Sequence, residues 1–217
     1  IPQRQGCCGA LMLHAGLEED AAMMARQFID AFDMELSTVD AIVVNAAGCG
    51  STLKEYGHLL RDDPDYASKA ETLAAKCRDI SEVLADLEPR APRHPVPLRI
   101  AYHDACHLQH AQHITDEPRQ VLSTIPELQV HEIPEAGLCC GSAGIYNLVE
   151  PESARELGSR KARHVVTTGA DVVVSSNPGC LLQIKSALES EEAGCTLRTM
   201  HLVELVDASI QGTALDG

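Results

Sequence analysis

A short cysteine motif that occurs twice constrains this chain more than any other feature. Cys7-Cys8-Gly9 and Cys139-Cys140-Gly141 lie 132 residues apart, and each follows an Ile-Pro pair after the same four-residue spacer. Each copy also has a later Gly-Cys pair after an apolar run, Gly48-Cys49 and Gly179-Cys180, which lie 131 residues apart. A single repeat of this length indicates a duplicated unit and not a solenoid. We therefore expect two related units.

The second copy contains an element that has no counterpart in the first. A strand predicted at 98–103 runs into Cys106, which lies 33 residues before Cys139. By the offset of the repeat, the matching segment of the first copy would lie upstream of Ile1. We expect a first cysteine-rich unit at 1–88 that is truncated at its N-terminus.

The other boundaries follow from a proline-rich stretch. Residues 89–97 contain no apolar periodicity and are predicted to be a linker. The second cysteine-rich unit is expected at 98–217.

Composition narrows the fold class and the range of partners. With no Trp, two Phe and four Tyr, the core must be built from Ala, Leu, Val and Ile, as in helix-covered parallel sheets. The formal charge of -15 excludes nucleic acid and an anionic membrane surface as partners, because both would repel the chain. No apolar run approaches the roughly 20 residues of a membrane span. We expect a cytoplasmic protein.

Apolar periodicity predicts alternating helices and strands. Helices are expected at 9–15, 18–36, 52–60, 63–77, 81–87, 105–112, 118–124, 151–166, 181–188 and 201–210, and strands at 40–45, 98–103, 128–133 and 171–176. This alternation predicts an α/β fold of two pseudo-repeated units, each a small, mostly parallel sheet covered by helices.

Cysteines follow the predicted strands of the second half. Loops that leave the carboxyl ends of parallel strands gather at one edge of the sheet, where ligands bind. Gly141 and Gly179 would let the backbone approach a bound group closely, and helix N-termini there would favour thiolates. We expect four thiols to meet at this edge: Cys106, Cys139, Cys140 and Cys180.

Four thiolates at one point suit a metal centre. A four-cysteine zinc site and a [4Fe-4S] cluster need the same number of thiolates, so the count leaves both open. In the first unit, Cys7, Cys8 and Cys49 would form an incomplete second site whose fourth ligand lies upstream. The alternative is that these are ordinary packing cysteines, which is what we expect of Cys77 and Cys195, since neither has a counterpart in the repeat.

Histidines also lie near the predicted centre. His103, His107 and His110 flank Cys106, and His103 with Cys106 would offer nitrogen and sulfur ligands. We favour unliganded histidines, with Tyr102 or His103 hydrogen-bonded to a cluster sulfur. No nucleotide-binding signature accompanies these residues, so the chain is not expected to oxidise an organic substrate by itself.

At these residues the chain resembles a known family. It is similar to the cysteine-rich domains found in heterodisulfide reductases, anaerobic glycerol-3-phosphate dehydrogenases, lactate-utilisation proteins and the glycolate oxidase iron-sulfur subunit. The last resemblance is the strongest and rests on Gly6-Cys-Cys-Gly-Ala-Leu, Gly48-Cys-Gly-Ser-Thr-Leu-Lys-Glu-Tyr-Gly-His, Ala101-Tyr-His-Asp-Ala-Cys-His-Leu-Gln-His and Leu138-Cys-Cys-Gly-Ser-Ala-Gly-Ile-Tyr-Asn.

The resemblance implies cofactors and partners. It implies an N-terminal ferredoxin-like domain with two [4Fe-4S] clusters, outside this chain, and partner subunits that carry FAD and oxidise glycolate to glyoxylate. The chain would then pass electrons from flavin towards the respiratory chain, within a complex that is cytoplasmic or peripheral at the inner membrane, and would be inactive alone. The alternatives are a zinc-stabilised docking module for the flavin subunits and a lactate-utilisation or heterodisulfide-reductase-like subunit.

One branch of the family differs at a ligand position. In heterodisulfide reductases the trailing cysteine belongs to a Cys-x-x-Cys pair, and five thiolates hold a non-cubane cluster. Here Thr52 and Gln183 occupy the second position of that pair. The resemblance therefore implies a four-cysteine site in the second unit, with His103, Gly141 and Gly179 around it.

Overall fold

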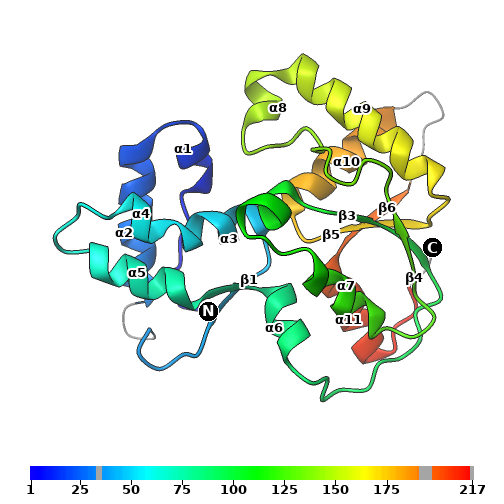
Figure 1. The fold of residues 1–217 in the computed structure, drawn as a ribbon, viewed down its shortest axis with the longest axis horizontal. Helices are drawn as coiled ribbons and strands as arrows, with labels where there is room; N and C mark the ends of the chain where they lie inside the picture. Colours follow the sequence, from blue (N-terminus) through cyan, green and yellow to red (C-terminus); the bar gives the residue numbers. More distant parts are fainter. Residues whose placement is uncertain (33–35, 191–196, 216–217) are drawn as a thin grey trace. The chain divides into compact units, whose positions relative to one another are not determined.

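The structure is a computed structural model that describes residues 1–32, 36–190 and 197–215. Its chain divides into two compact units, Ile1–Asp79 and Ile80–Gly217 (Figure 1). Every strand pairing in the described part of the chain is parallel, and helices flank both sheets, which confirms the predicted α/β class.

The division between the units lies earlier than the expected position at residue 88. The helix α6 (Ile80–Asp86), which we expected to end the first unit, packs against a helix of the second unit, α7 (Asp116–Ser123). The compact unit therefore ends at Asp79.

The first unit is a two-stranded sheet with helices around it. Its elements are α1 (Ala10–His14), α2 (Glu18–Phe32), β1 (Ile42–Val44), α3 (Ala47–Lys54), α4 (Tyr56–Leu59), α5 (Ala67–Lys76) and β2 (Cys77–Asp79). Its core is built around three aromatic rings: Phe28 stacks on Phe32 at 4.8 Å between ring centroids and meets Tyr56 edge-on at 6.1 Å.

The strand β2 corrects the prediction of a helix through residue 77. Cys77 is the first residue of β2 and pairs with Ile42, while the helix ends at Lys76. A strand of three residues is too short to produce an alternating pattern in the sequence. Cys77 is buried, as expected, and burial raises the pKa of its thiol to about 12. Cys195 lies outside the described residues.

The second unit is built on a four-stranded parallel sheet in the order β4-β3-β5-β6. After α6, its elements are β3 (Arg99–His103), a π-helical turn (His107–Ala111), α7, β4 (Gln129–Glu132), α8 (Tyr146–Val149), α9 (Pro151–Thr167), β5 (Val172–Ser175), α10 (Pro178–Ser190), β6 (Arg198–His201) and α11 (Leu202–Gln211). The strand β6 was not predicted, since its four residues have no alternating pattern.

Successive side chains of each strand point to opposite faces of this sheet. Ile100 and Tyr102 of β3 belong to a core cluster that they share with Val121 of α7 and Leu205 of α11. In Figure 1, α9 and α10 cover the opposite face, towards which His103 is directed by the period of two. Buried apolar side chains line both faces, among them Ala101 and Ile184 on the second, and that second face also carries the buried His103.

The strand order also creates a switch point. From β3 the chain continues to β4 on one side, and from β5 it continues to β6 on the other. The carboxyl ends of the adjacent strands β3 and β5 therefore lie at the point where open parallel sheets bind ligands.

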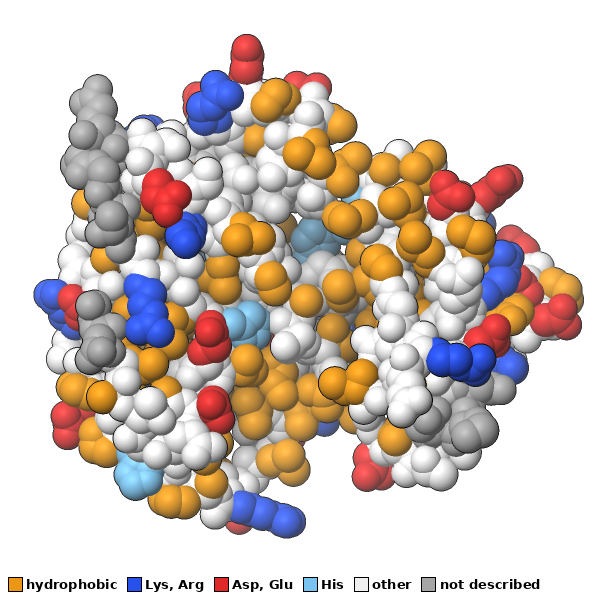
Figure 2. All heavy atoms as spheres, turned by 180° about the vertical axis from the view of Figure 1, so that it is seen from behind, with side chains coloured by type: hydrophobic (Ala, Val, Ile, Leu, Met, Phe, Trp, Pro, Cys, Tyr) orange, Lys and Arg blue, Asp and Glu red, His pale blue; other side chains and the backbone are white. Residues whose placement is uncertain are grey.

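Helix length and the distribution of basic side chains can be compared with the needs of a membrane span and of a basic surface. No helix among the described residues combines the length and apolarity that a bilayer crossing requires. On the face drawn in Figure 2, Lys and Arg side chains of the described residues stand singly and form no continuous basic surface.

Candidate metal centre

The turn Cys139-Cys140-Gly141 lies against α9 in a conformation that needs glycine. Gly141 has φ +95°, and a Cβ at this position would lie 2.4 Å from the carbonyl oxygen of Ala154. The Gly141 N–H donates to Cys139 Sγ at 3.3 Å. The close contact with α9 and the N–H···S bond together hold the two cysteines in place.

The first unit repeats this turn. Gly9 has φ +79° and its N–H donates to Cys7 Sγ at 3.5 Å. The hydroxyl of the fully buried Tyr56 donates to the carbonyl oxygen of Cys8 at 2.7 Å. The repeated motif in the sequence is thus a repeated three-dimensional turn.

Four thiols meet at the carboxyl edge of the second sheet. Ligand atoms of His103, Cys140 and Cys180 lie within 4.8 Å of one another, and all three residues are buried. Cys139 continues the group through side-chain hydrogen bonds to Cys140 and to Cys106. The structure thus brings together all four cysteines predicted to converge, as free thiols.

Hydrogen bonding divides these thiols into two protonation classes. Hydrogen bonds from Cys106 and Cys140 lower the pKa of Cys139, and a hydrogen bond from Cys140 is the main cause that lowers the pKa of Cys180 to about 5. The hydrogen bond to Cys139, together with burial, raises the pKa of Cys106. Hydrogen bonds to Cys139 and Cys180, together with burial, raise the pKa of Cys140. Negative charge is therefore favoured at Cys139 and Cys180 before any metal binds.

Each trailing cysteine lies in the first turn of a helix. The helices predicted from 52 and 181 begin earlier, at Ala47 in α3 and Pro178 in α10, so that Cys49 and Cys180 lie inside them. The N-terminus of a helix is electropositive and favours thiolates.

A histidine accompanies the four thiols. His103 is 2% exposed, it is hydrogen-bonded to Cys180, and its Nδ1 is buried without a hydrogen-bond partner in the described part of the chain. Tyr102, the other candidate, lies in the opposite core, with its hydroxyl 3.4 Å from Ser176 Oγ. His107 Nδ1 lies 3.6 Å from Cys106 Sγ.

The two positions that depart from the Cys-x-x-Cys pattern are occupied by bonded polar side chains. Thr52 is buried and its hydroxyl donates to the carbonyl oxygen of Gly48 at 3.2 Å. The Gln183 side-chain oxygen accepts from Asn147 Nδ2 at 3.3 Å. Neither side chain can act as a fifth thiolate.

The three cysteines of the first unit also lie together. Cys8 is hydrogen-bonded to Cys49, which lowers the pKa of Cys49 to about 7, while the same bond and burial raise that of Cys8. Cys7 is exposed. All three line a pocket of about 540 Å³ together with the strand β1 and Phe28.

The donor set of the second unit fits an iron-sulfur cluster. Four cysteine thiols are the usual ligands of such clusters, and the N–H groups of helix starts and glycine turns commonly hydrogen-bond to their sulfurs. The unpartnered Nδ1 of His103 is a buried polar atom that a bound group would satisfy.

A family model described as a cysteine-rich domain (CCG) matches residues 1–54 and 100–185, more than half of the chain. The chain belongs to the CCG family. The two segments that the CCG model matches contain all seven cysteines predicted as ligands and leave out Cys77 and Cys195.

Relatives of this CCG chain include named iron-sulfur subunits. It is 41% identical over 208 residues to the "Probable glycolate oxidase iron-sulfur subunit" of Bacillus subtilis and 34% identical over 209 residues to the "Glycolate oxidase iron-sulfur subunit" of Escherichia coli. These matches cover 95% of this chain but only 46% and 49% of the relatives. The resemblance to glycolate oxidase iron-sulfur subunits is confirmed, and the chain spans about half of their length.

Two further comparisons concern a lactate-utilisation protein and a solved structure. "Lactate utilization protein A" of Halalkalibacterium halodurans is 28% identical over 208 residues, covering 95% of this chain and 83% of that protein. The crystal structure of a hypothetical protein from Helicobacter pylori matches with a TM-score of 0.59 over 94% of this chain and 46% of that one. At 10% identity, this structure shows a shared fold alone.

Sequence reasoning missed Asn177, which contacts the site directly. Its side-chain amide donates to Cys180 Sγ at 3.2 Å. Asparagine just before a Pro-initiated helix is typical of an N-cap, and that preference was the available signal.

Proposed function

We propose that the second unit of this CCG chain holds an iron-sulfur cluster, bound by Cys106, Cys139, Cys140 and Cys180. The single observation that supports it most is the gathering of these four thiols near the carboxyl ends of β3 and β5, from segments up to 74 residues apart in the sequence. Thiol packing alone does not require such convergence, because a free cysteine packs as any small apolar residue does.

A [4Fe-4S] cluster at this site would supply reversible one-electron redox chemistry. The chain's own residues would hold it and set its surroundings. Asn177 and the Gly141 N–H donate to thiol sulfurs, and His103 lies beside Cys140 and Cys180. Such hydrogen bonds to sulfur tune the potential of a centre.

We further propose that Cys7, Cys8 and Cys49 form part of a second centre. Their turn matches that of the second unit, and they share a pocket. The proposed ligands are these three, since Cys106 has no counterpart in the first unit.

The names of the relatives support a proposal for the larger role. We propose that the chain is the electron-transfer part of a flavin-dependent glycolate oxidase complex, which takes electrons from reduced flavin on partner subunits during oxidation of glycolate to glyoxylate and passes them towards the respiratory chain. Two relatives at 41% and 34% identity have glycolate oxidase in their names. A lactate-oxidising complex is the neighbouring candidate, given the relative named for lactate utilisation.

A cysteine substitution in the anaerobically purified full-length protein tests the site. We expect Cys180→Ala to lose the iron and sulfide of one cluster. The visible absorption band of that cluster and its spin-resonance signal after reduction should be lost as well. Cys77→Ala is the matched control, because Cys77 is an equally buried thiol that lies outside the site. Unchanged iron content in Cys180→Ala would show that the ligand assignment is wrong.

Zinc is the second candidate for this site. His103, Cys140 and Cys180 form a mixed nitrogen and sulfur donor set, which zinc accepts. A zinc-bound docking module would contain one zinc per site and give neither the absorption band nor the spin-resonance signal. The same metal analysis therefore separates the two functions, and turnover of the complex with glycolate against lactate separates the two substrates.

A further inference from the structure

Lys161 is a fully buried lysine whose side chain reaches the segment that leads into the cysteine turn. It is 0% exposed and belongs to α9. Its ammonium group donates to the carbonyl oxygens of Glu135 at 2.9 Å and Ala136 at 3.4 Å, in the segment that leads into the turn at 139–141. A lysine is almost never fully buried unless a negative group compensates its charge.

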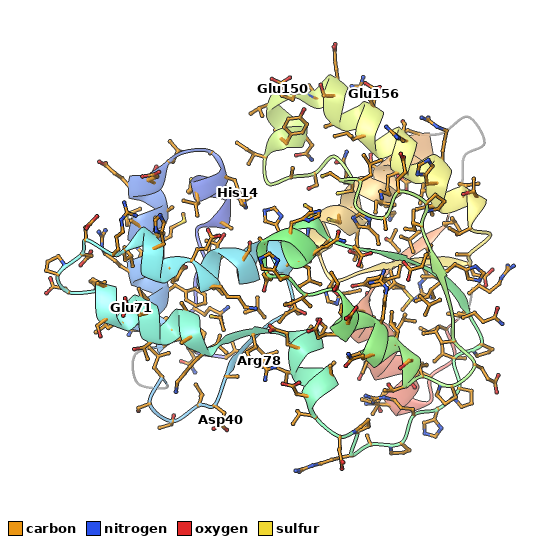
Figure 3. All side chains as sticks on the ribbon, viewed as in Figure 1. His14, Asp40, Glu71, Arg78, Glu150 and Glu156 are labelled. Carbon is orange, nitrogen blue, oxygen red and sulfur yellow. The ribbon has the colours of Figure 1, made fainter. Side chains whose placement is uncertain are left out.

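The face of α9 that carries Lys161 is the one that supports the cysteine turn. Ala154 on this face receives Gly141, and a Cβ on Gly158 would lie 3.5 Å from the carbonyl oxygen of Cys140. Lys161 follows Gly158 by three residues and therefore lies on the same side of the helix. Glu156, labelled in Figure 3, is exposed on the outer side of α9.

No carboxylate in the described part of the chain forms an ion pair with Lys161. The carboxylate of Glu135 pairs with Arg160 and His164 instead, and only its carbonyl oxygen meets the ammonium group. Burial lowers the pKa of Lys161, while negative charge at Cys140, Asp104 and Cys139 acts against this shift. The ammonium group is thus held by backbone carbonyl oxygens of the segment that leads into the cysteine turn, and by no carboxylate of its own.

The internal repeat shows that packing does not require a lysine here. The buried faces of α2 and α9 have the same spacing of five positions, Ala21, Ala25, Phe28, Ile29 and Phe32 in one and Ala154, Gly158, Lys161, Ala162 and Val165 in the other. The first member of each set contacts the glycine of its own turn. Phe28 is therefore the counterpart of Lys161, and it lines the cysteine pocket of the first unit.

We propose that Lys161 is the built-in positive charge of the second centre, which raises its reduction potential and helps retain it. This inference rests on the proposed iron-sulfur function. A centre with four thiolates is negatively charged, and each added electron makes it more so. A fixed cation in a water-excluded position therefore stabilises the reduced form more than the oxidised form. The first centre, with Phe28 in the equivalent position, lacks this charge.

Three substitutions separate charge from hydrogen bonding in the anaerobic full-length protein. Lys161→Gln removes the charge and keeps an N–H donor for the carbonyl of Glu135, Lys161→Met removes both, and Lys161→Arg keeps the charge. Lys185→Met is the control, since it removes the same charge from an exposed position on α10. The readouts are the midpoint potential from a spectroscopic redox titration and the iron content after exposure to a chelator.

We expect Lys161→Gln and Lys161→Met to shift one centre to a lower potential and to lose iron faster, and Lys161→Arg and Lys185→Met to stay near the wild type. If the potential of the neutral variants equals that of Lys185→Met, the proposal is wrong. If Lys161→Met does not fold, the midpoint potential of Lys161→Gln is compared with that of Lys185→Met in the same way. A wild-type protein without any cluster signal would instead refute the proposed function itself.

Discussion

At the scale of single residues, Gly141 has the strongest local requirement in the site. Gly141→Ala would place a methyl group against the carbonyl oxygen of Ala154 and force an L-residue into a left-handed conformation. We expect a loss of about 2–4 kcal/mol in the free energy of unfolding, from strain and overpacking together. Urea unfolding of the metal-free chain measures it.

Gly137→Ala is the matched control for this substitution. Gly137 lies in the same segment, has no left-handed φ, and would have open space around a Cβ. Its replacement should change the stability by less than about 1 kcal/mol. Equal losses in the two variants would contradict the idea that the contact with α9 dictates the glycine.

At the scale of elements, Arg119 of α7 joins two strand ends near the site. Its guanidinium donates to both carboxylate oxygens of Asp104, at 2.9 and 2.8 Å, and to Glu132 at the end of β4. Asp104 lies between β3 and Cys106 and its side chain is only 5% exposed. This network fixes the loop that carries Cys106.

Arg119→Met should therefore cost more stability than the loss of a surface ion pair. We expect about 2–3 kcal/mol, because the buried carboxylate of Asp104 would lose its charged partner. Arg99→Met, which breaks an exposed pair with Asp171, should cost less than about 1 kcal/mol. The urea midpoints of both variants measure these losses. Equal losses of stability in Arg119→Met and Arg99→Met would contradict the role of burial.

At the scale of the whole molecule, arginine partners make both units sensitive to acid. Arg26, Arg160 and Arg99 lower the pKa of Asp63, Glu135 and Asp171 below the ordinary values of 3.8 for Asp and 4.5 for Glu. The unfolded chain then binds protons at a higher pH than the folded chain. This stabilisation is complete above the ordinary values and is lost as the pH falls through the lowered ones.

Acid titration of the metal-free chain tests this sign. The urea midpoint should fall between about pH 5 and about pH 3 as these carboxylates take up protons. In Arg160→Met the part of this decline that belongs to Glu135 should disappear. A midpoint that rose on acidification would show that other groups dominate.

The periodicity of the sequence was sufficient for the longer elements and for the convergence of the cysteines. Buried runs such as Val172–Ser175 and the apolar stripe of α2 predict their elements because their patterns extend over several residues. The short strands β2 and β6 were missed, since three or four residues acquire their conformation from a neighbouring strand and not from their own pattern.

The sequence by itself determined the duplication, the α/β class and which cysteines share an edge, because each depends only on spacing and on the order of strands. The tertiary structure alone decided that His103 and not Tyr102 faces the thiols, that Asn177 donates to Cys180, and that Lys161 is buried beside them. These three contacts depend on which face of a strand or helix packs against which neighbouring element. A local sequence pattern does not specify that neighbour.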